Sequence, residues 1–98
     1  MQNLKPLPVM WRGSAKLFAA LGDEYRQRIL LMCARKPELR MQDVFAALPL
    51  SRTALAHHVS VLREAGLLTA EKRGGEIYLT VNLETFRRAA RIVRSPRA

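Results

Sequence analysis

The chain has 98 residues, which suffices for one domain with a single modest hydrophobic core. Its 49% content of hydrophobic residues excludes a disordered chain, and its single cysteine excludes both an intrachain disulfide and a cysteine cage for a metal ion. With 17 lysines and arginines against 8 acidic residues, the formal net charge is +9, which favours a polyanionic partner such as nucleic acid.

We expect residues 1–13 to form an extended N-terminal arm, because they contain Pro6, Pro8 and Gly13. The two prolines also argue against a secretory signal in this segment. The longest apolar run, residues 29–34, is far shorter than the about 20 residues that a membrane span needs. Together with the lone cysteine, these features predict a soluble, cytoplasmic protein without a membrane partner.

Two short helices are predicted next, over residues 14–21 and 23–35. Ser14 and Asp23 are suitable N-cap residues, a glycine separates the two helices, and Pro37 prevents the second from continuing. Apolar side chains line one side of each helix at helical spacing: Leu17, Phe18 and Leu21 in the first, and Tyr25, Ile29 and Met32 or Cys33 in the second.

A helix-turn-helix is predicted from residue 39 onward, with its first helix over residues 39–48 and Pro49 in the turn. Ser51 caps the second helix, and Gly66 ends it. An apolar stripe on the second helix faces the core: Leu55, Val59 and Leu62. The opposite face is small and polar, which suits close approach to another polar surface: Thr53, His57, Ser60 and Glu64.

After Gly66 the apolar spacing changes to two, which predicts a hairpin of two short strands around Gly74 and Gly75. Asn82 can cap a last helix over residues 83–94, with arginines on one side and apolar residues on the other. These elements, in the order α-α-α-α-β-β-α, predict a mainly α winged helix-turn-helix domain over residues 14–94, with a small β-hairpin wing and a basic tail over residues 95–98.

Three runs of the sequence are similar to the ArsR family of small winged-helix repressors: Leu17-Phe18-Ala19-Ala20-Leu21-Gly22-Asp23 with Arg26-Gln27-Arg28-Ile29-Leu30, Leu50-Ser51 through His57-His58-Val59, and Val61-Leu62-Arg63-Glu64-Ala65-Gly66-Leu67. The resemblance covers roughly residues 15–82. It implies a homodimer, built through the first and last helices, that binds an inverted repeat near a promoter and leaves it on meeting an inducer.

The sensor sites of that family are not matched. Metal-sensing members carry Cys-x-Cys before an Asp-Leu at the start of the third helix, where this chain has Arg40-Met41-Gln42-Asp43-Val44. Others bind zinc through Asp, His and Glu of the last helix, which here has Glu84 as its only acid and no histidine. A third branch senses sulfur or oxidants with two cysteines, whereas this chain has only one. We therefore expect no metal site and no cofactor, and the inducer stays unknown.

Nine residues of the second helix and the wing are the predicted contacts with double-stranded DNA: Ser51, Arg52, Thr53, Ala54, Ala56, His57, Ser60, Lys72 and Arg73. Arg52 either donates two hydrogen bonds to a guanine or binds phosphate. His57 either donates a hydrogen bond to phosphate or a base edge, or is simply exposed to solvent. His58 lies nearer the core, which favours a packing or capping role. The two alanines allow approach to a thymine methyl, although helix propensity also explains them.

The terminal helices supply the predicted dimer interface: Leu17, Phe18, Leu21, Phe86, Ala89, Ala90 and Val93. Packing on the chain's own core is the alternative for the last helix. Cys33 is expected to be a buried small hydrophobe, with a redox-sensing role as the alternative. No catalytic constellation is present, so we predict a sequence-specific DNA-binding repressor rather than an enzyme. The alternative is a winged-helix module that binds an acidic protein with the same basic surface.

Overall fold

The computed structural model describes residues 4–94, so the predicted basic tail lies outside the described residues. It contains five α-helices, a short 3-10 helix and three strands, in chain order η1 (Val9–Trp11), α1 (Ala15–Leu21), α2 (Glu24–Ala34), β1 (Leu39–Arg40), α3 (Met41–Ala47), α4 (Arg52–Glu64), β2 (Leu68–Arg73), β3 (Glu76–Val81) and α5 (Leu83–Arg94). This is the predicted winged helix-turn-helix, with one strand and one 3-10 turn that the sequence did not reveal.

Side-chain caps fix where three helices begin. Asp23 accepts a hydrogen bond from the backbone N–H of Arg26 at 3.0 Å, and Ser51 accepts one from Ala54 at 3.1 Å. Asn82 caps α5 through the backbone N–H groups of Glu84 and Thr85. These caps confirm the predicted helix starts, because each oxygen satisfies an amide that has no partner inside its helix.

Ser14 does not cap α1 with its side chain, contrary to the prediction. Its hydroxyl instead donates to the carbonyl oxygen of Trp11 at 2.6 Å, and the Trp11 ring stacks on Phe18 with 5.5 Å between centroids. The end of the predicted arm therefore folds back onto α1 and forms η1, and is not extended throughout.

The predicted helix over residues 39–48 begins two residues late, because Leu39 and Arg40 form strand β1. This strand pairs antiparallel with β3, opposite Leu79 and Tyr78, which gives a three-stranded sheet in the order β1-β3-β2. Leu39 is buried in the core while Arg40 points outward. A strand of two residues is too short for its alternation to be visible in the sequence.

The predicted hairpin is present, with β2 and β3 paired from Leu68 opposite Val81 to Arg73 opposite Glu76. Gly74 and Gly75 form its two-residue turn with φ of +56° and +84°. Positive φ at both positions is the requirement of a type I′ turn, and glycine meets it without steric cost.

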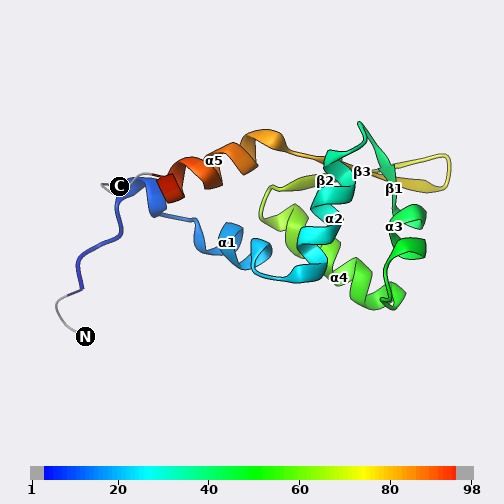
Figure 1. Ribbon diagram of the computed structural model, residues 1–98, viewed down its shortest axis with the longest axis horizontal. Coiled ribbons are helices and arrows are strands. Elements are labelled where there is room, and N and C mark those ends of the chain that lie inside the picture. Colours follow the sequence, from blue (N-terminus) through cyan, green and yellow to red (C-terminus); the bar gives the residue numbers. More distant parts are fainter. Residues whose placement is uncertain (1–3, 95–98) are drawn as a thin grey trace.

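All five α-helices and one face of the sheet contribute to the core, α5 through Ala89, and the core consists of aliphatic side chains together with Cys33. In Figure 1, α1 and α5 lie at one end of the molecule, and the hairpin tip lies at the other. Within residues 4–94, no helix combines the length and the hydropathy needed to cross a membrane.

Helix α5 packs on the rest of the chain through a stripe that includes Ile92, which the sequence analysis did not single out. Ala89 and Ile92 are buried and Phe86 is half-buried, whereas Ala90 and Val93 are exposed. The inward stripe thus follows a spacing of three residues from Phe86 through Ile92. A helix with apolar residues over much of its surface has more than one possible inward face, so periodicity alone does not decide which face packs on the core.

Candidate nucleic-acid interface

Helix α4 presents one polar face outward because its apolar stripe anchors it. Leu55, Val59 and Leu62 are all buried, as predicted. Most of the predicted contact residues on this helix and its cap are exposed: Ser51, Arg52, Thr53, Ala56, His57 and Ser60. Ala54 is the exception and is half-buried, since it sits beside the buried stripe.

Arg52 is held against α3 at the start of this face. Its guanidinium carbon lies 4.4 Å from the centroid of the Phe45 ring, a cation–π contact between the two helices of the helix-turn-helix. The same two residues border a hollow of about 540 Å³ that runs between α3, α4 and the wing: Arg40, Met41, Gln42, Phe45, Arg52, Leu55, Ala56, Gly75, Glu76 and Ile77. The hollow therefore separates the wing from the exposed face of α4.

The paired histidines have different environments. His57 is exposed, whereas the side chain of His58 is only 14% exposed. Nδ1 of His58 lies 3.1 Å from Nη1 of Arg26 and 3.9 Å from a carboxylate oxygen of Asp23. Because a guanidinium can only donate, Nδ1 of His58 is the acceptor. These contacts agree with the predicted packing role of His58.

Arg26 connects α4 to the end of α1. Besides His58, it donates to the backbone carbonyl oxygens of Ala19 at 3.0 Å and Ala20 at 2.9 Å. The last carbonyl groups of a helix have no partner within it, and this arginine binds two of them, of which that of Ala19 also accepts from the backbone N–H of Gly22. Three helices thereby meet at one side chain.

The two basic residues of the wing tip are also not equivalent. Arg73 pairs with a carboxylate oxygen of Glu38 and, at 3.5 Å, with Glu71, and its guanidinium lies 4.1 Å from the Tyr78 ring centroid. The hydrogen bond to Glu38 raises the pKa of Arg73. Lys72 is exposed and makes no ion pair with any residue of the described part of the chain.

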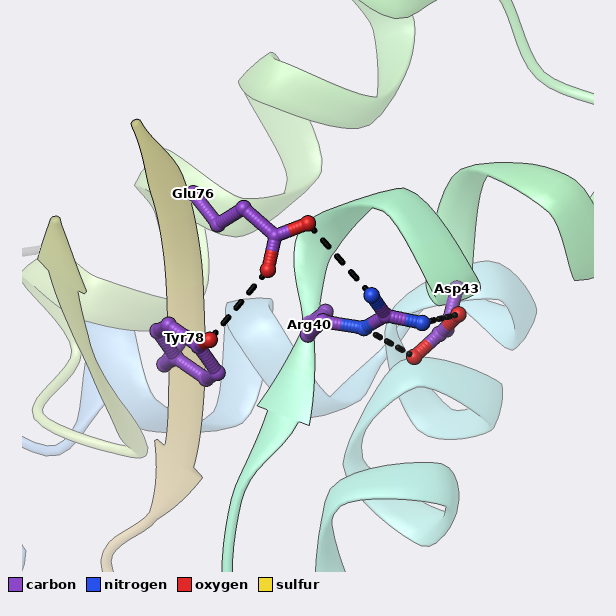
Figure 2. A network of polar contacts seen from close by, with 4 residues as sticks. All are labelled: Arg40, Asp43, Glu76 and Tyr78. Atoms are coloured by element: carbon purple, nitrogen blue, oxygen red, sulfur yellow. Dashed lines mark hydrogen bonds and ion pairs between the residues drawn. The ribbon is translucent and has the colours of Figure 1, made fainter. Parts of the chain in front are cut away.

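A second arginine contacts the wing from the start of α3. Arg40 donates to both carboxylate oxygens of Asp43 at 3.1 Å and to Glu76 at 3.4 Å, and the Tyr78 hydroxyl donates to the other oxygen of Glu76 at 3.2 Å (Figure 2). The hydrogen bonds to Asp43 raise the pKa of Arg40. From the sequence, Arg40 was interpreted only as a replacement for a metal ligand, and its partner Glu76, which lies 36 positions away, was missed.

Neither a metal site nor an accessible thiol is found in the described region. No three His, Cys, Asp or Glu side chains among residues 4–94 are grouped so as to hold a metal ion. Cys33 is fully buried, and burial raises the pKa of its thiol to about 11.

The residues of the predicted dimer interface fall into two groups. Leu17 and Ala89 are buried in the chain's own core, so neither presents a surface. The others are half-buried or exposed: Phe18, Leu21, Phe86, Ala90 and Val93.

Comparisons with known proteins identify the class to which this fold belongs. The chain is 33% identical over 78 residues to the arsenical resistance operon repressor of Escherichia coli, which covers 80% of this chain and 67% of that protein. It is 35% identical over 68 residues to the arsenic resistance transcriptional regulator ArsR1 of Pseudomonas putida, covering 69% of this chain. The chain spans about half of ArsR1, since the match covers 53% of it.

A solved structure supports the same assignment. The ArsR-like transcriptional regulator from Rhodococcus superposes with a TM-score of 0.77 at 32% identity, over 85% of this chain and 75% of the other. No protein-family model matches the chain. These relatives are transcriptional regulators, which confirms the predicted winged-helix fold and the choice of a regulator over an enzyme. The chain belongs to the ArsR family of transcriptional regulators.

Proposed function

We propose that this protein is a homodimeric, sequence-specific DNA-binding repressor that needs no metal ion. The observation that carries the proposal is the exposed face of α4, where Thr53, His57 and Ser60 are small or hydrogen-bonding and are all exposed. The E. coli relative is a repressor by name. As a regulator of chromosomal DNA, the protein would act in the cytoplasm.

The proposed roles follow from position on the helix. Thr53 and His57 lie one turn apart on the outer face and are the proposed readers of base edges in the major groove. Ser51 and Arg52 at the start of α4 are proposed to hold phosphate, because the first turn offers free backbone N–H groups beside the cation. Ala56 is exposed and Ala54 is half-buried, so Ala56 is the better placed for a thymine methyl.

The proposed dimer rests on exposed apolar side chains of α2 and α5. Leu31, Leu83 and Val93 are 58%, 53% and 66% exposed, which is unusual for large aliphatic side chains. Between α2 and α5 lies a hollow of about 390 Å³ with an almost entirely apolar lining: Leu21, Gln27, Leu30, Leu31, Ala34, Leu83 and Phe86. A second copy of the chain would remove this surface from water.

Independence from metal is proposed from the chemistry at the start of α3. Arg40 and Gln42 stand where metal-sensing members of the family carry thiolates. The Arg40 guanidinium donates hydrogen bonds to both carboxylate oxygens of Asp43. A cation would meet a fixed positive charge there. The inducer is not identified by any side chain of this site.

An electrophoretic mobility shift on the DNA upstream of the protein's own gene, with excess random competitor, tests the proposal. We expect a competitor-resistant complex that zinc and arsenite do not dissolve. A protein that binds an acidic partner protein but shows no preference for any DNA would instead favour the interaction-module function. Loss of the complex at stoichiometric zinc would contradict metal independence alone.

A further inference from the structure

The wing is tied to the helix-turn-helix by a continuous chain of side chains, here called the wing clasp: Glu38, Arg40, Asp43, Arg73, Glu76 and Tyr78. Arg73 binds Glu38 and stacks on Tyr78, Tyr78 donates to Glu76, and Glu76 accepts from Arg40. Asp43 then accepts two hydrogen bonds from Arg40. Figure 2 shows the Arg40 guanidinium lying between Asp43 and Glu76.

The clasp joins segments that the backbone hardly connects. Strand β1 pairs with β3 over two residues only, and both of these pairs lie on the core side of Glu76. Apart from these backbone pairs, hydrogen bonds between side chains connect the wing with the segment that leads into α3. Arg40 and Glu76 of the clasp also border the hollow between the wing and α4.

The charges of the clasp make its arginines poor phosphate ligands. Two arginines face three clasp carboxylates, and Glu71 adds a fourth at 3.5 Å from Arg73. A phosphate that approached Arg73 would have to displace Glu38 and would be repelled by the carboxylate at its side. Lys72, next in sequence, has no such partner in the described chain and is free to extend.

We propose that Arg40 and Arg73 are positioning residues that hold the wing at a fixed distance from α4, and that Lys72 alone makes the cationic contact of the wing with DNA phosphate. The inference rests on the proposed DNA binding and deepens it. It reassigns Arg73 from direct contact, which the sequence suggested, to support of its neighbour.

A charge exchange tests the pair Glu38–Arg73. Arg73→Glu places two carboxylates together and should weaken operator binding about fivefold or more, since it both frees the wing and repels phosphate. The double variant E38R/R73E restores the pair with its charges reversed and should recover affinity to within about twofold of wild type. A matched control, E24R/R73E, has the same net charge with the compensating arginine on α2 and should stay as weak as Arg73→Glu.

Two milder variants separate positioning from loss of folding. Tyr78→Phe keeps the ring under Arg73 but removes the hydroxyl that binds Glu76, and should weaken operator binding about twofold without changing the dependence of affinity on salt. Lys72→Gln should flatten the slope of log affinity against log salt by about one for each phosphate that the wing no longer neutralises. Thermal unfolding of every variant checks that each is folded.

The outcomes distinguish this inference from the proposed function. If the wild-type protein shows no specific DNA binding, both the proposed function and the inference about the wing clasp are wrong. If the wild type binds specifically but E38R/R73E is as weak as Arg73→Glu, only the inference about the wing clasp is wrong. It is also wrong if E24R/R73E restores affinity as well as E38R/R73E does. The same holds if Arg73→Gln flattens the salt slope as much as Lys72→Gln does.

Discussion

At the scale of single residues, the structure separates neighbours that look alike in the sequence. His57 is exposed, while His58 accepts a hydrogen bond from Arg26 and packs inward. Lys72 is free of ion pairs among the described residues, while Arg73 is bound to carboxylates. A basic or imidazole side chain thus has a role set by its partners rather than by its type.

Base reading by Thr53 and His57 is tested by truncation. Thr53→Ala and His57→Ala should each weaken the specific complex by about 1–3 kcal/mol, because each removes a proposed hydrogen bond to a base edge, and should leave random DNA nearly unaffected. Competition binding against the operator and a scrambled duplex measures both values. Glu64→Gln, on the same outer face but near the end of α4, is the control and should keep the preference. Equal losses on both duplexes would contradict the assignment.

Cys33 is predicted not to sense oxidants. Its thiol is fully buried and its pKa is raised to about 11, so little thiolate exists near neutral pH to react with peroxide or a persulfide. Cys33→Ala should bind the operator, with and without peroxide, as the wild type does. Alanine is chosen because a serine hydroxyl would be buried without a known partner. If peroxide releases the wild type and not the variant, the thiol reaches solvent in some other state of the protein.

At the scale of elements, most boundaries follow from local chemistry. Asp23, Ser51 and Asn82 cap the helices that the sequence assigned to them, and the double glycine turn fixes the register of the hairpin. These features depend on residues at most three apart, which is why they could be predicted. Strand β1 could not, because only its pairing with β3 makes it a strand.

The cap of α2 gives a prediction about acid stability. The backbone hydrogen bond from Arg26 is the largest cause that lowers the pKa of Asp23 below its ordinary 3.8. A carboxyl group with a lowered folded-state pKa stabilises the fold above its unfolded pKa, and this contribution is lost as the pH falls through the folded value. Asp23→Ala should therefore cost about 1 kcal/mol at pH 7 and less below pH about 3.

Urea unfolding at pH 7 and in acid measures this difference. Asp23→Asn is the control, because its amide oxygen still caps the helix but does not titrate. It should retain most of the stability at pH 7 and lose less of it in acid than the wild type does. An Ala variant as stable as wild type at pH 7 would show that the cap contributes nothing.

At the scale of the whole molecule, contacts between distant residues escape sequence reasoning. The clasp joins residues 35 and 36 positions apart, and no local pattern marks Glu38 or Glu76 as partners of an arginine. Ile92 of α5, which is fully buried, was not singled out for a related reason, since α5 also carries another apolar stripe at positions i, i+3, i+7 and i+10: Leu83, Phe86, Ala90 and Val93. Which stripe faces the core depends on where the rest of the fold lies.

The exposed stripe of α5 leads to the prediction about assembly. A stable dimer buries roughly 1,200–2,000 Å² in total. The exposed side chains of Leu31, Leu83 and Val93, with the apolar hollow between α2 and α5, are the surface proposed for it. Val93→Glu places a charge in the proposed interface and should convert the proposed dimer to a folded monomer, because an unpaired buried charge costs several kcal/mol. Light scattering after size exclusion measures the mass. Arg88→Gln, exposed elsewhere on α5, should remain dimeric.

The monomeric variant should also lose most of its affinity for an inverted repeat while it keeps weak binding to random DNA, since only a dimer engages two half-sites at once. A Val93→Glu protein that stays dimeric and binds the repeat normally would move the interface away from α5.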